Sequence, residues 1–487
     1  MKKTLLLLMF LLAEMLHAQN ASFLDGSQEI SNSLRLAKEA QFRVNNIFRG
    51  GTFTSGDSAR FQSVLKKVLT DSNDIGLVAG ITDDRDARWS GAENHPAVSQ
   101  NAKMKANYVF GIGSNTKSIT SAAILLLMED GKLTLEDKLS KWLHNYKNVD
   151  PDITIRQCLQ MTSGIYNFTD HPNFFAAISA NPTKIWTPEE VLTTFVGKPL
   201  FNKGTSWKYS NTNYVLLGLI IEKASGMAYK DFVRSRIIEP LGLSSFSYYP
   251  HEAPTAPMAH AWADINQDKI PDDLNALGFS LKSFFSAAGA AGAYLATAQD
   301  LSRWNHALFT GQLLQPSSLA EMKKEYKLNN SSGYGLGILV LHTSGGNLFG
   351  HNGSIIYQSL VYYQPDLGVS ISAITNNIHD VFSLTPVFNG LLSEYLSIIT
   401  AVEKPFLPQG EITLNTLFHS DLKIQYNRQE INQCSIYKMS TGRQLYNNQS
   451  MPTGELVVPT RKWSSGMYII QLLDKQGKRQ TLKAIKW

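Results

Sequence analysis

Cysteine is scarce in this chain, with only Cys158 and Cys434 among 487 residues. The two cysteines fall in what we expect to be different domains, so we predict no disulfide bond between them. Cys158 lies in a helix-like run over 154–161 and should pack as a small apolar residue. Because apolar residues make up 43% of the chain and charged residues 17%, we expect most of it to fold as an ordinary globular protein.

Several patterns that mark other enzyme classes are also missing. No two of the eleven histidines stand at the H-x-H or H-x-x-x-H spacing of zinc ligands, which disfavours a zinc hydrolase. No G-x-S-x-G occurs, which disfavours hydrolases with that nucleophile turn. Eleven of the 45 basic and five of the 40 acidic residues lie beyond position 406, which leaves 34 against 35 before it. A body so close to neutral, without a run of Lys and Arg, argues against a nucleic-acid enzyme.

The first residues have the pattern of a targeting segment. A lysine pair precedes an unbroken apolar run over 5–12, and Ala18 offers a small residue at a cleavage point before Gln19. We therefore predict a signal peptide over 1–18 and a mature protein that is secreted or lies at the outer cell surface, passing the periplasm in transit. No cysteine follows the cleavage point, so we expect no lipid anchor, and no stretch has the length of a membrane span.

The rest of the chain divides into four expected parts. Strand-like runs at both ends of a large domain flank helical runs, which predicts an α+β fold with one antiparallel sheet shared by the two ends of the domain. Alternating runs near the C-terminus predict a small β-sandwich, and two prolines mark the linker before it. The parts are an N-terminal extension (19–60), the large domain (61–402), the linker (403–410) and the β-sandwich (411–487). Within the large domain, we expect 76–81 and 108–112 to pair as a hairpin.

Ser114-Asn115-Thr116-Lys117 opens a long apolar run that follows a Gly-Ile-Gly break and ends at Gly131. The run predicts a helix that is apolar nearly all round and therefore buried. Ser114 and Lys117 would share one helix face. An amine whose pKa is lowered by burial can take the proton of a serine hydroxyl, and N–H groups at the helix start favour an oxyanion. An isolated S-x-x-K is usually a capping Ser with a solvated Lys, but a buried helix favours the catalytic interpretation.

Two further motifs follow along the chain. Tyr209-Ser210-Asn211 precedes a helical run, and it offers a phenol to move protons and an amide to hold a substrate amide, or else a packed Tyr and a capping Asn. His351-Asn352-Gly353-Ser354 lies on a strand-like run. Its glycine would let another backbone approach closely, and its histidine could meet a substrate carboxylate or be structural.

Together, and in this order, the three motifs resemble those of the penicillin-recognising serine hydrolases, in the branch of class C β-lactamases and D-Ala-D-Ala carboxypeptidases. The resemblance covers about 65–400 and includes the landmarks 159–164, 290–300 with the tryptophan that follows, and 334–337. It implies a β-lactamase/transpeptidase-like fold, in which helices and an all-helical subdomain flank the central antiparallel sheet. It also implies an acyl-enzyme mechanism that needs neither metal nor cofactor.

The resemblance also implies roles for single residues. The proposed nucleophile is Ser114, with Lys117 and Tyr209 sharing general-base and general-acid work. Substrate binding would fall to Asn211, His351, Gly353 and Ser354. The backbone N–H groups of Ser114 and Ser354 would form the oxyanion hole.

Some positions depart from the family pattern. His351 stands where class C β-lactamases carry Lys, which removes a permanent positive charge and weakens the β-lactamase interpretation. Met161 replaces a His, and Tyr357-Gln358 replaces a small residue followed by an aromatic one. We therefore expect a peptidase or amidase acting on D-Ala-D-Ala-like ends, with a carboxylesterase or class C-type β-lactamase as alternatives. A non-catalytic binding or scaffold protein on the same fold is the alternative from another class.

Two further patterns concern partners. The β-sandwich region, with its segments 464–474 and 482–487, resembles type IX secretion sorting domains, which would make the export machinery a partner besides the peptide or small-molecule substrate. The stretch from Asp264 to Asp273 is similar to a calcium loop, but Lys269 occupies the position where Gly is wanted, so we favour a solvated acidic loop. We expect no nucleic-acid partner.

Overall fold

The structure is a computed structural model that describes residues 52–400, except 73–74, 97, 101, 265–270, 344 and 378–383, together with the strands and a few neighbouring residues between 412 and 486. The signal peptide, most of the N-terminal extension and the linker of the sequence-based prediction lie outside the described residues. The described chain forms two compact units, and the division falls between Glu394 and Tyr395. Each unit is described by itself below.

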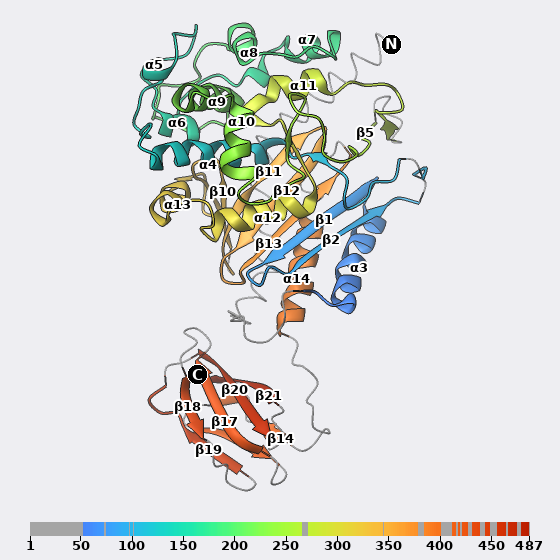
Figure 1. The fold of residues 1–487 in the computed structure, drawn as a ribbon, viewed down its shortest axis with the longest axis vertical. Coiled ribbons are helices and arrows are strands. Elements are labelled where there is room, and N and C mark those ends of the chain that lie inside the picture. Colours follow the sequence, from blue (N-terminus) through green and yellow to red (C-terminus); the bar gives the residue numbers. More distant parts are fainter. Residues whose placement is uncertain are drawn as a thin grey trace. The chain divides into compact units, whose positions relative to one another are not determined.

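The first unit is built on an antiparallel sheet (Figure 1). Its first strand, β1, pairs with β13 near the other end of the unit, so that Leu77 lies opposite Thr375. This pairing of strands from both ends is the arrangement that the sequence pattern predicts. The described strands, in sheet order, are β2 (Arg88–Asn94), β1 (Gly76–Asp83), β13 (Val369–Thr375), β12 (Tyr357–Gln364), β11 (Gly346–Ile355), β10 (Leu339–Thr343), β9 (Ser332–Tyr334) and β8 (Tyr326–Lys327).

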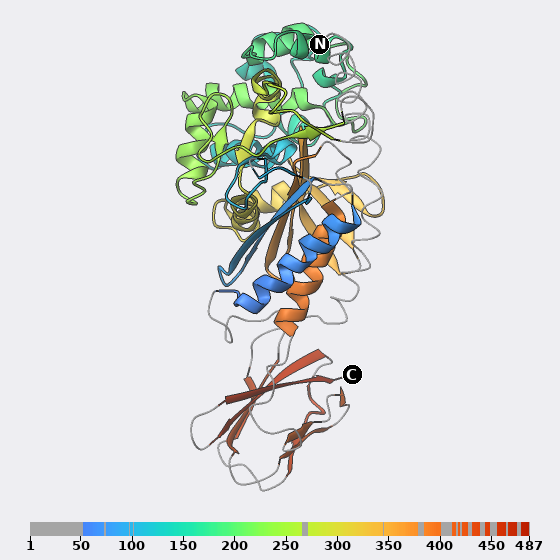
Figure 2. The ribbon, with the colours of Figure 1, turned by 90° about the vertical axis from the view of Figure 1, so that its right-hand side faces the viewer.

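Helices cover both faces of this sheet, as Figure 2 shows. On one face of the sheet, Gly80 of β1 lies against the start of the helix at Ala298, because a Cβ there would lie 2.6 Å from the backbone oxygen of Ala298. Gly91 of β2 faces the other way and lies against Gln62. At Gly390 the last helix of the unit packs against the first one, on that second face. The three covering helices are α12 (Ala298–Phe309), α3 (Ser55–Asp71) and α14 (Thr385–Thr400).

The remaining helices form the helical subdomain beside the sheet (Figure 1). Its centre is α4, whose side chains are buried from Thr116 to Leu127, packed against α9. Its helices are α4 (Thr116–Glu129), α5 (Leu139–Trp142), α6 (Ile155–Leu159), α7 (Phe174–Ala180), α8 (Pro188–Phe195), α9 (Asn211–Ser225), α10 (Tyr229–Val233), α11 (Lys282–Ala288) and α13 (Pro316–Lys323), with the short turns η2 (Gly113–Asn115), η3 (Phe168–Asp170), η4 (Arg234–Ile238) and η5 (Gly289–Ala291).

One sequence-based pairing is wrong. The hairpin partner of β1 is β2, not 108–112. Only Phe110–Gly111 of that segment forms a strand, β3, in a small separate sheet with β7 (Tyr294–Ala296) and β4 (Ser247–Tyr248). The reason is that Val109 and Ile112 lie against 257–259 and Tyr294, so the segment's backbone partners come from the helical subdomain. A further pair, β5 (Trp262–Ala263) and β6 (Asp272–Asp273), makes a two-stranded sheet.

The second unit consists of two small sheets around an apolar core, which confirms the fold class predicted for the C-terminal region. The core contains Leu422, Ile436 and Ile470, all fully buried. Cys434 lies in this core and Cys158 lies in the first unit, and both are free thiols. The sheets are β14 (Ile412–Leu414), β16 (Asp421–Tyr426) and β19 (Glu455–Pro459), and β15 (Leu417–Phe418), β21 (Arg479–Lys486), β20 (Gly466–Asp474), β17 (Ile431–Lys438) and β18 (Gln444–Asn448).

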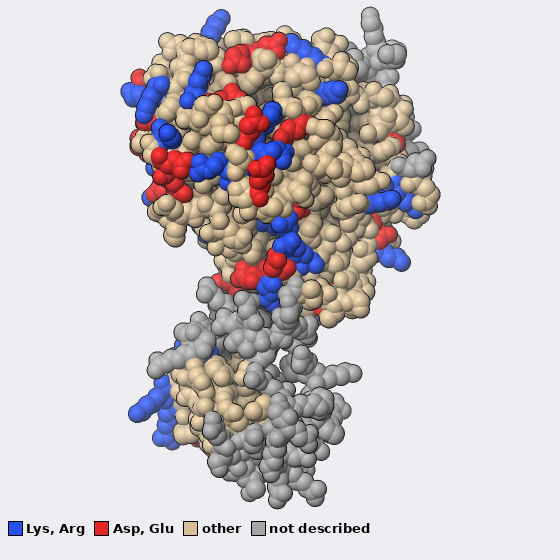
Figure 3. Space-filling view, in the orientation of Figure 1, with Lys and Arg blue, Asp and Glu red and all other residues tan. Residues whose placement is uncertain are grey.

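Two surface features bear on the sequence-based predictions. Lys and Arg side chains alternate with Asp and Glu on the visible face of the first unit, as Figure 3 shows. Most of the acidic stretch between Asp264 and Asp273 lies outside the described residues, and Asp273 itself binds the His260 ring through a 2.8 Å hydrogen bond. Within the described ranges, no group of three or more His, Cys, Asp or Glu could hold a metal ion, and no helix is long and apolar enough to cross a membrane.

Candidate active site

Ser114 lies on a sharp turn between β3 and α4. Gly113 just before it has a left-handed φ of +50°, and a Cβ there would lie 2.6 Å from the backbone nitrogen of Ser354. Glycine is required at this position because other residues would be strained and would collide with β11. The Gly-Ile-Gly break in the sequence therefore places the nucleophile candidate directly against the strand that carries the third motif.

The first two motifs meet at the hydroxyl of Ser114. Lys117 Nζ lies 2.9 Å from Ser114 Oγ, and Tyr209 OH lies 2.7 Å from the same oxygen. Lys117 Nζ also donates a 2.8 Å hydrogen bond to the backbone oxygen of Ala291 in η5. The amine is thus fixed between its own helix and η5, with the serine oxygen in hydrogen-bonding range of both neighbours.

The burial of these groups sets their protonation. Lys117 is fully buried, and desolvation holds the pKa of its ammonium well below the usual value. Burial raises the pKa of Tyr209 above its usual range, although the hydrogen bond with Ser114 acts in the opposite direction. Near neutral pH the phenol therefore keeps its proton, while the amine is the group that can lose its charge. A neutral Lys117 can accept the hydroxyl proton of Ser114 along the existing contact.

Asn211 begins α9 directly after Tyr209-Ser210, close to residues that the sequence patterns did not single out. Its backbone N–H donates to Asn167 Oδ1 at 2.9 Å, and its side-chain Nδ2 lies 3.5 Å from Thr169 Oγ1. Both partners come from the segment at η3. No side-chain periodicity marks this segment, which is why only the landmark before it, 159–164, carried a signal.

Met161 has a structural explanation. Its backbone adopts a left-handed φ of 62°, and its sulfur accepts hydrogen bonds from the backbone N–H of Ser210 and from Asn213 Nδ2, at 3.4 and 3.3 Å. A thioether is a weak acceptor. Met161 therefore supports the loop that carries Tyr209, in the position where the family often carries His.

The third motif lies within β11, and its histidine is engaged by the protein itself. His351 Nδ1 hydrogen-bonds the backbone oxygen of Asn352, and its Nε2 lies 3.1 Å from Tyr334 OH. A carbonyl can only accept, so Nδ1 carries the proton and the neutral ring accepts from Tyr334 at Nε2. Burial, with the nearby Lys117, lowers the pKa of His351 to about 3. The imidazole is therefore neutral at physiological pH, with both nitrogens in use.

Gly353 and Ser354 complete the strand's contact with the nucleophile turn. A Cβ on Gly353 would lie 2.0 Å from the backbone oxygen of Ile112, so the close neighbour at this glycine is the chain itself. Ser354 presents its backbone nitrogen to Gly113, and its hydroxyl accepts a 3.0 Å hydrogen bond from Gln358. The structure thus brings all seven predicted site residues to the junction of α4, α9 and β11.

The landmark segment 334–337 supplies contacts that the motifs alone did not predict. Tyr334 packs edge-on against the rings of Tyr209 and His351. Gly337 has a left-handed φ of +77°, and a Cβ there would lie 2.0 Å from Ser121 Oγ on α4. The sequence marked this segment only as a family landmark. The contacts of Tyr334 and Gly337 depend on long-range packing that spacing does not reveal.

Comparison with known proteins agrees with this geometry. The family model described as Beta-lactamase matches residues 61–384, about two thirds of the chain. The chain belongs to the beta-lactamase family. Members of this family are serine hydrolases, and the α+β fold with an antiparallel sheet flanked by helices is the one the sequence predicted. The second unit lies outside the matched residues.

Single relatives and solved structures are also similar to this chain. Penicillin-binding protein 4* from Bacillus subtilis (strain 168) is 29% identical over 268 residues, which span 53% of this chain and 58% of that relative. A D-stereospecific amidohydrolase from Streptomyces sp. is 31% identical, with a TM-score of 0.58 over 66% of this chain and 94% of that one. The D-amino acid amidase from Ochrobactrum anthropi SV3, at 24% identity and a TM-score of 0.59 over 69% of this chain and 98% of that one, shares the fold.

Proposed function

We propose that this chain is an exported serine amidase or peptidase that forms an acyl-enzyme on Ser114. The observation that carries the proposal is the position of Ser114 Oγ, 2.9 Å from a fully buried amine and 2.7 Å from a buried phenol. Burying an amine costs free energy. Among the described residues, no carboxylate pairs with Lys117, so function explains its place better than stability does.

The reaction follows from the arrangement of these groups. Neutral Lys117 takes the proton of Ser114 as the oxygen attacks a substrate carbonyl. The backbone N–H groups of Ser114 and Ser354 stabilise the oxyanion. As the C–N bond breaks, Tyr209 gives its proton to the leaving nitrogen and takes up the proton that Lys117 had accepted. Asn211 holds the substrate amide. Water then attacks the acyl group and releases the acid and the free enzyme.

The substrate class is proposed from the relatives together with the third motif. The similar Streptomyces protein is described as a D-stereospecific amidohydrolase, and the Bacillus relative as a penicillin-binding protein. We infer that this chain cleaves amide bonds of D-amino acid derivatives, with D-Ala-D-Ala-like peptide ends as one candidate. Both nitrogens of neutral His351 are engaged, so this ring does not supply a positive charge for a substrate carboxylate. Amides without a free carboxylate near the scissile bond should therefore be preferred.

An ester substrate is the second candidate, and the neutral state of His351 favours it. Esters of small acids lack the carboxylate that D-Ala-D-Ala ends and β-lactams carry. Neutral His351 therefore favours an esterase over a β-lactamase. The choice between ester and amide depends on how much leaving-group protonation Tyr209 must supply, since an amine leaves less readily than an alcohol.

A substrate panel separates these candidates. Purified protein lacking residues 1–18 is offered D- and L-phenylalanine amide, a D-Ala-D-Ala peptide with either a free or an amidated end, a p-nitrophenyl ester, and nitrocefin. We expect the highest kcat/KM for a D-configured amide and a preference for the amidated peptide. A nitrocefin rate far above all others would contradict the proposal. Ser114→Ala serves as the control, and labelling by a fluorophosphonate separates an enzyme from a non-catalytic binding protein.

Export is proposed on the sequence pattern of residues 1–18 and on the second unit. The second unit has an apolar core of its own and lies beyond the family match. We propose that it serves as a type IX secretion sorting domain, which places the enzyme outside the cell or on its surface. Cell fractionation of the full chain and of a chain ending at 402 tests this. Equal export of both would remove the sorting role.

A further inference from the structure

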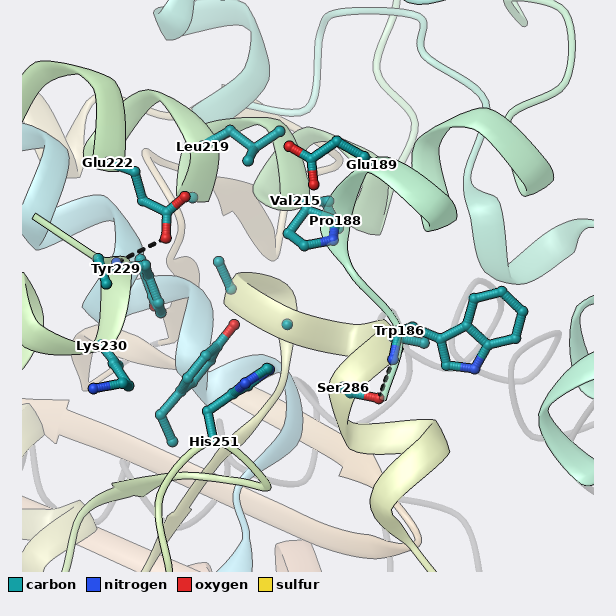
Figure 4. Close-up of a pocket in the computed structure, with 16 residues that line it drawn as sticks. Trp186, Pro188, Glu189, Val215, Leu219, Glu222, Tyr229, Lys230, His251 and Ser286 are labelled. Carbon is teal, nitrogen blue, oxygen red and sulfur yellow. Dashed lines mark hydrogen bonds between the residues drawn. The ribbon is translucent and has the colours of Figure 1, made fainter. Parts of the chain in front are cut away.

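A cavity lies between α8, α9, α10 and η5, close to the candidate active site but apart from it (Figure 4). Its volume is about 180 Å³. An engineered apolar cavity of about 150 Å³ holds benzene, so this space can hold a molecule with one ring. The lining residues used in the following argument are Glu189, Leu219, Glu222, Ala228, Tyr229, Lys230, Tyr248, His251 and Ala290.

This cavity is separate from the catalytic residues but shares a wall with them. None of the seven predicted site residues lines it. Ala290 of η5 lines it, and the next residue, Ala291, accepts the hydrogen bond from Lys117. The η5 turn therefore has this cavity on one side and the catalytic amine on the other.

The lining combines aromatic faces with an unused hydroxyl. Tyr229 and Tyr248 pack with ring centroids 5.0 Å apart, and the His251 ring stacks on Tyr248. Tyr248 is only 9% exposed, and a Cβ on Gly289 would lie 3.4 Å from its hydroxyl. This hydroxyl makes no hydrogen bond to any residue within the described part of the chain. A hydroxyl that lines the cavity without a protein partner offers a hydrogen bond to a ligand.

The charges around the cavity favour a cation. Glu189 and Glu222 both line it, and Glu222 accepts a 3.0 Å hydrogen bond from the backbone N–H of Tyr229. Figure 4 shows the two glutamates along the same side of the space. The one lysine of the lining, Lys230, is already paired with Asp231 at 2.6 Å. Burial, with nearby Lys230, lowers the pKa of His251. Near neutral pH the lining is therefore net negative.

We propose that this cavity binds a small organic ammonium with an apolar body of about one ring, and that its occupancy slows acylation of Ser114. The ammonium would lie near Glu222 and the aromatic faces, where cation–π attraction adds to charge. The apolar body would contact Leu219. The binding part of this inference stands independently of the proposed substrate class.

The route to the active site is a chain of short contacts. Tyr229 OH lies 2.7 Å from Thr120 Oγ1, and Thr120 donates a 2.7 Å hydrogen bond to the backbone oxygen of Ala290. Thr120 lies on α4 one turn after Lys117. A ligand that displaces Tyr229 or Ala290 would therefore move the η5 carbonyls, and with them the acceptor that fixes the Lys117 amine.

Binding is tested first, with phenethylamine as the probe. Titration calorimetry uses protein whose Ser114 carries a fluorophosphonate, so that the active site is blocked. We expect phenethylamine to bind at least about tenfold more tightly than neutral 2-phenylethanol, because of the charged contact. The anion 3-phenylpropanoate should not bind. If Ser114 is not labelled, the proposed function fails, and the titration is then made on Ser114→Ala.

Three variants locate the site. Glu222→Gln keeps an acceptor oxygen for Tyr229 and removes the charge, so it should weaken phenethylamine binding roughly tenfold. Ala228→Trp places a ring at the cavity from an exposed position whose own side chain makes no capping bond, and it should abolish binding. Glu239→Gln removes an exposed charge that does not line the cavity, and it should bind as the parent does.

The effect of a ligand in the cavity on Ser114 is tested by labelling kinetics on the full chain. Saturating phenethylamine should slow fluorophosphonate labelling of the parent at least about fivefold. It should cause no further slowing in Ala228→Trp, because the introduced ring already fills the cavity. The proposal is overturned if the three probes bind alike or not at all, or if binding survives Ala228→Trp. Persistent slowing in Ala228→Trp would assign the effect to the active site and overturn the coupling.

Discussion

The two units of this chain are built around very different interiors. In the second unit the core cluster is almost wholly apolar, with Leu422, Ile436 and Ile470 fully buried. The first unit also has a large apolar core, but at the junction of α4, α9 and β11 it buries Lys117 and His351. Unpaired buried amines and imidazoles oppose folding unless their hydrogen bonds compensate. The comparison suggests that the first unit carries a local stability cost at the candidate active site that the second unit does not have.

The strongest test of this comparison removes the buried amine. Lys117→Met keeps the length and volume of the side chain but removes the base, so the labelling rate of Ser114 should fall by on the order of 10³-fold or more. The free energy of unfolding of the first unit should stay equal or rise, because an unpaired buried amine is replaced by an apolar group. Stopped-flow labelling and denaturant titration measure the two effects.

The matched control is Lys132→Met, at an exposed position just beyond α4. It should change neither quantity. A large loss of stability in Lys117→Met would show that the hydrogen bonds of the amine to Ser114 and Ala291 outweigh its desolvation, and that the first unit carries no such cost.

The second test changes the apolar core of the second unit instead of the polar junction of the first. Ile470 is fully buried in the second unit, and Ile470→Ala should destabilise that unit by about 2–5 kcal/mol through the cavity it leaves. Hydrolysis by the first unit should not change, since the two units have separate cores. Calorimetric unfolding and kcat/KM on the same sample provide both readouts. Val457→Ala, at a position 45% exposed, is the control and should have little effect.

The third test uses pH. The pKa of His351 is lowered by burial from 6.5 to about 3. Between these values the unfolded chain binds a proton that the folded chain does not, so stability is present above pH 6.5 and is lost as pH falls toward 3. The slope approaches about 1.4 kcal/mol per pH unit from this single group. The first unit should show this slope in denaturant titrations, and His351→Asn should flatten it. An unchanged slope in that variant would mean that His351 is already protonated in the fold.

The sequence predicted the site better than it predicted the sheet. Ser114 and Lys117 share a helix face by spacing alone, and the Gly-Ile-Gly break marks the end of the strand before them. Spacing could not reveal that the backbone oxygen of Ala291 holds the amine, because a carbonyl has no sequence signature. Similarly, the segment 108–112 has the composition of a strand, but only tertiary packing decides that its backbone pairs with the helical subdomain.

The smallest expected effect concerns Tyr334, which the motifs did not identify. Tyr334→Phe removes the hydroxyl that donates to His351 Nε2 and leaves that nitrogen free to take up a proton. The pKa of the His351 imidazole should rise, and the larger protonated fraction at acidic pH would attract a substrate carboxylate. The preference for an amidated over a free-acid D-Ala-D-Ala peptide should then fall a few-fold, in line with one hydrogen bond. Tyr326→Phe, on the exposed edge strand, is the control. If Tyr334→Phe lowers the rates on both peptides equally, the hydroxyl only supports the ring of Tyr209, and the neutral histidine does not set the selectivity between carboxylate and amide.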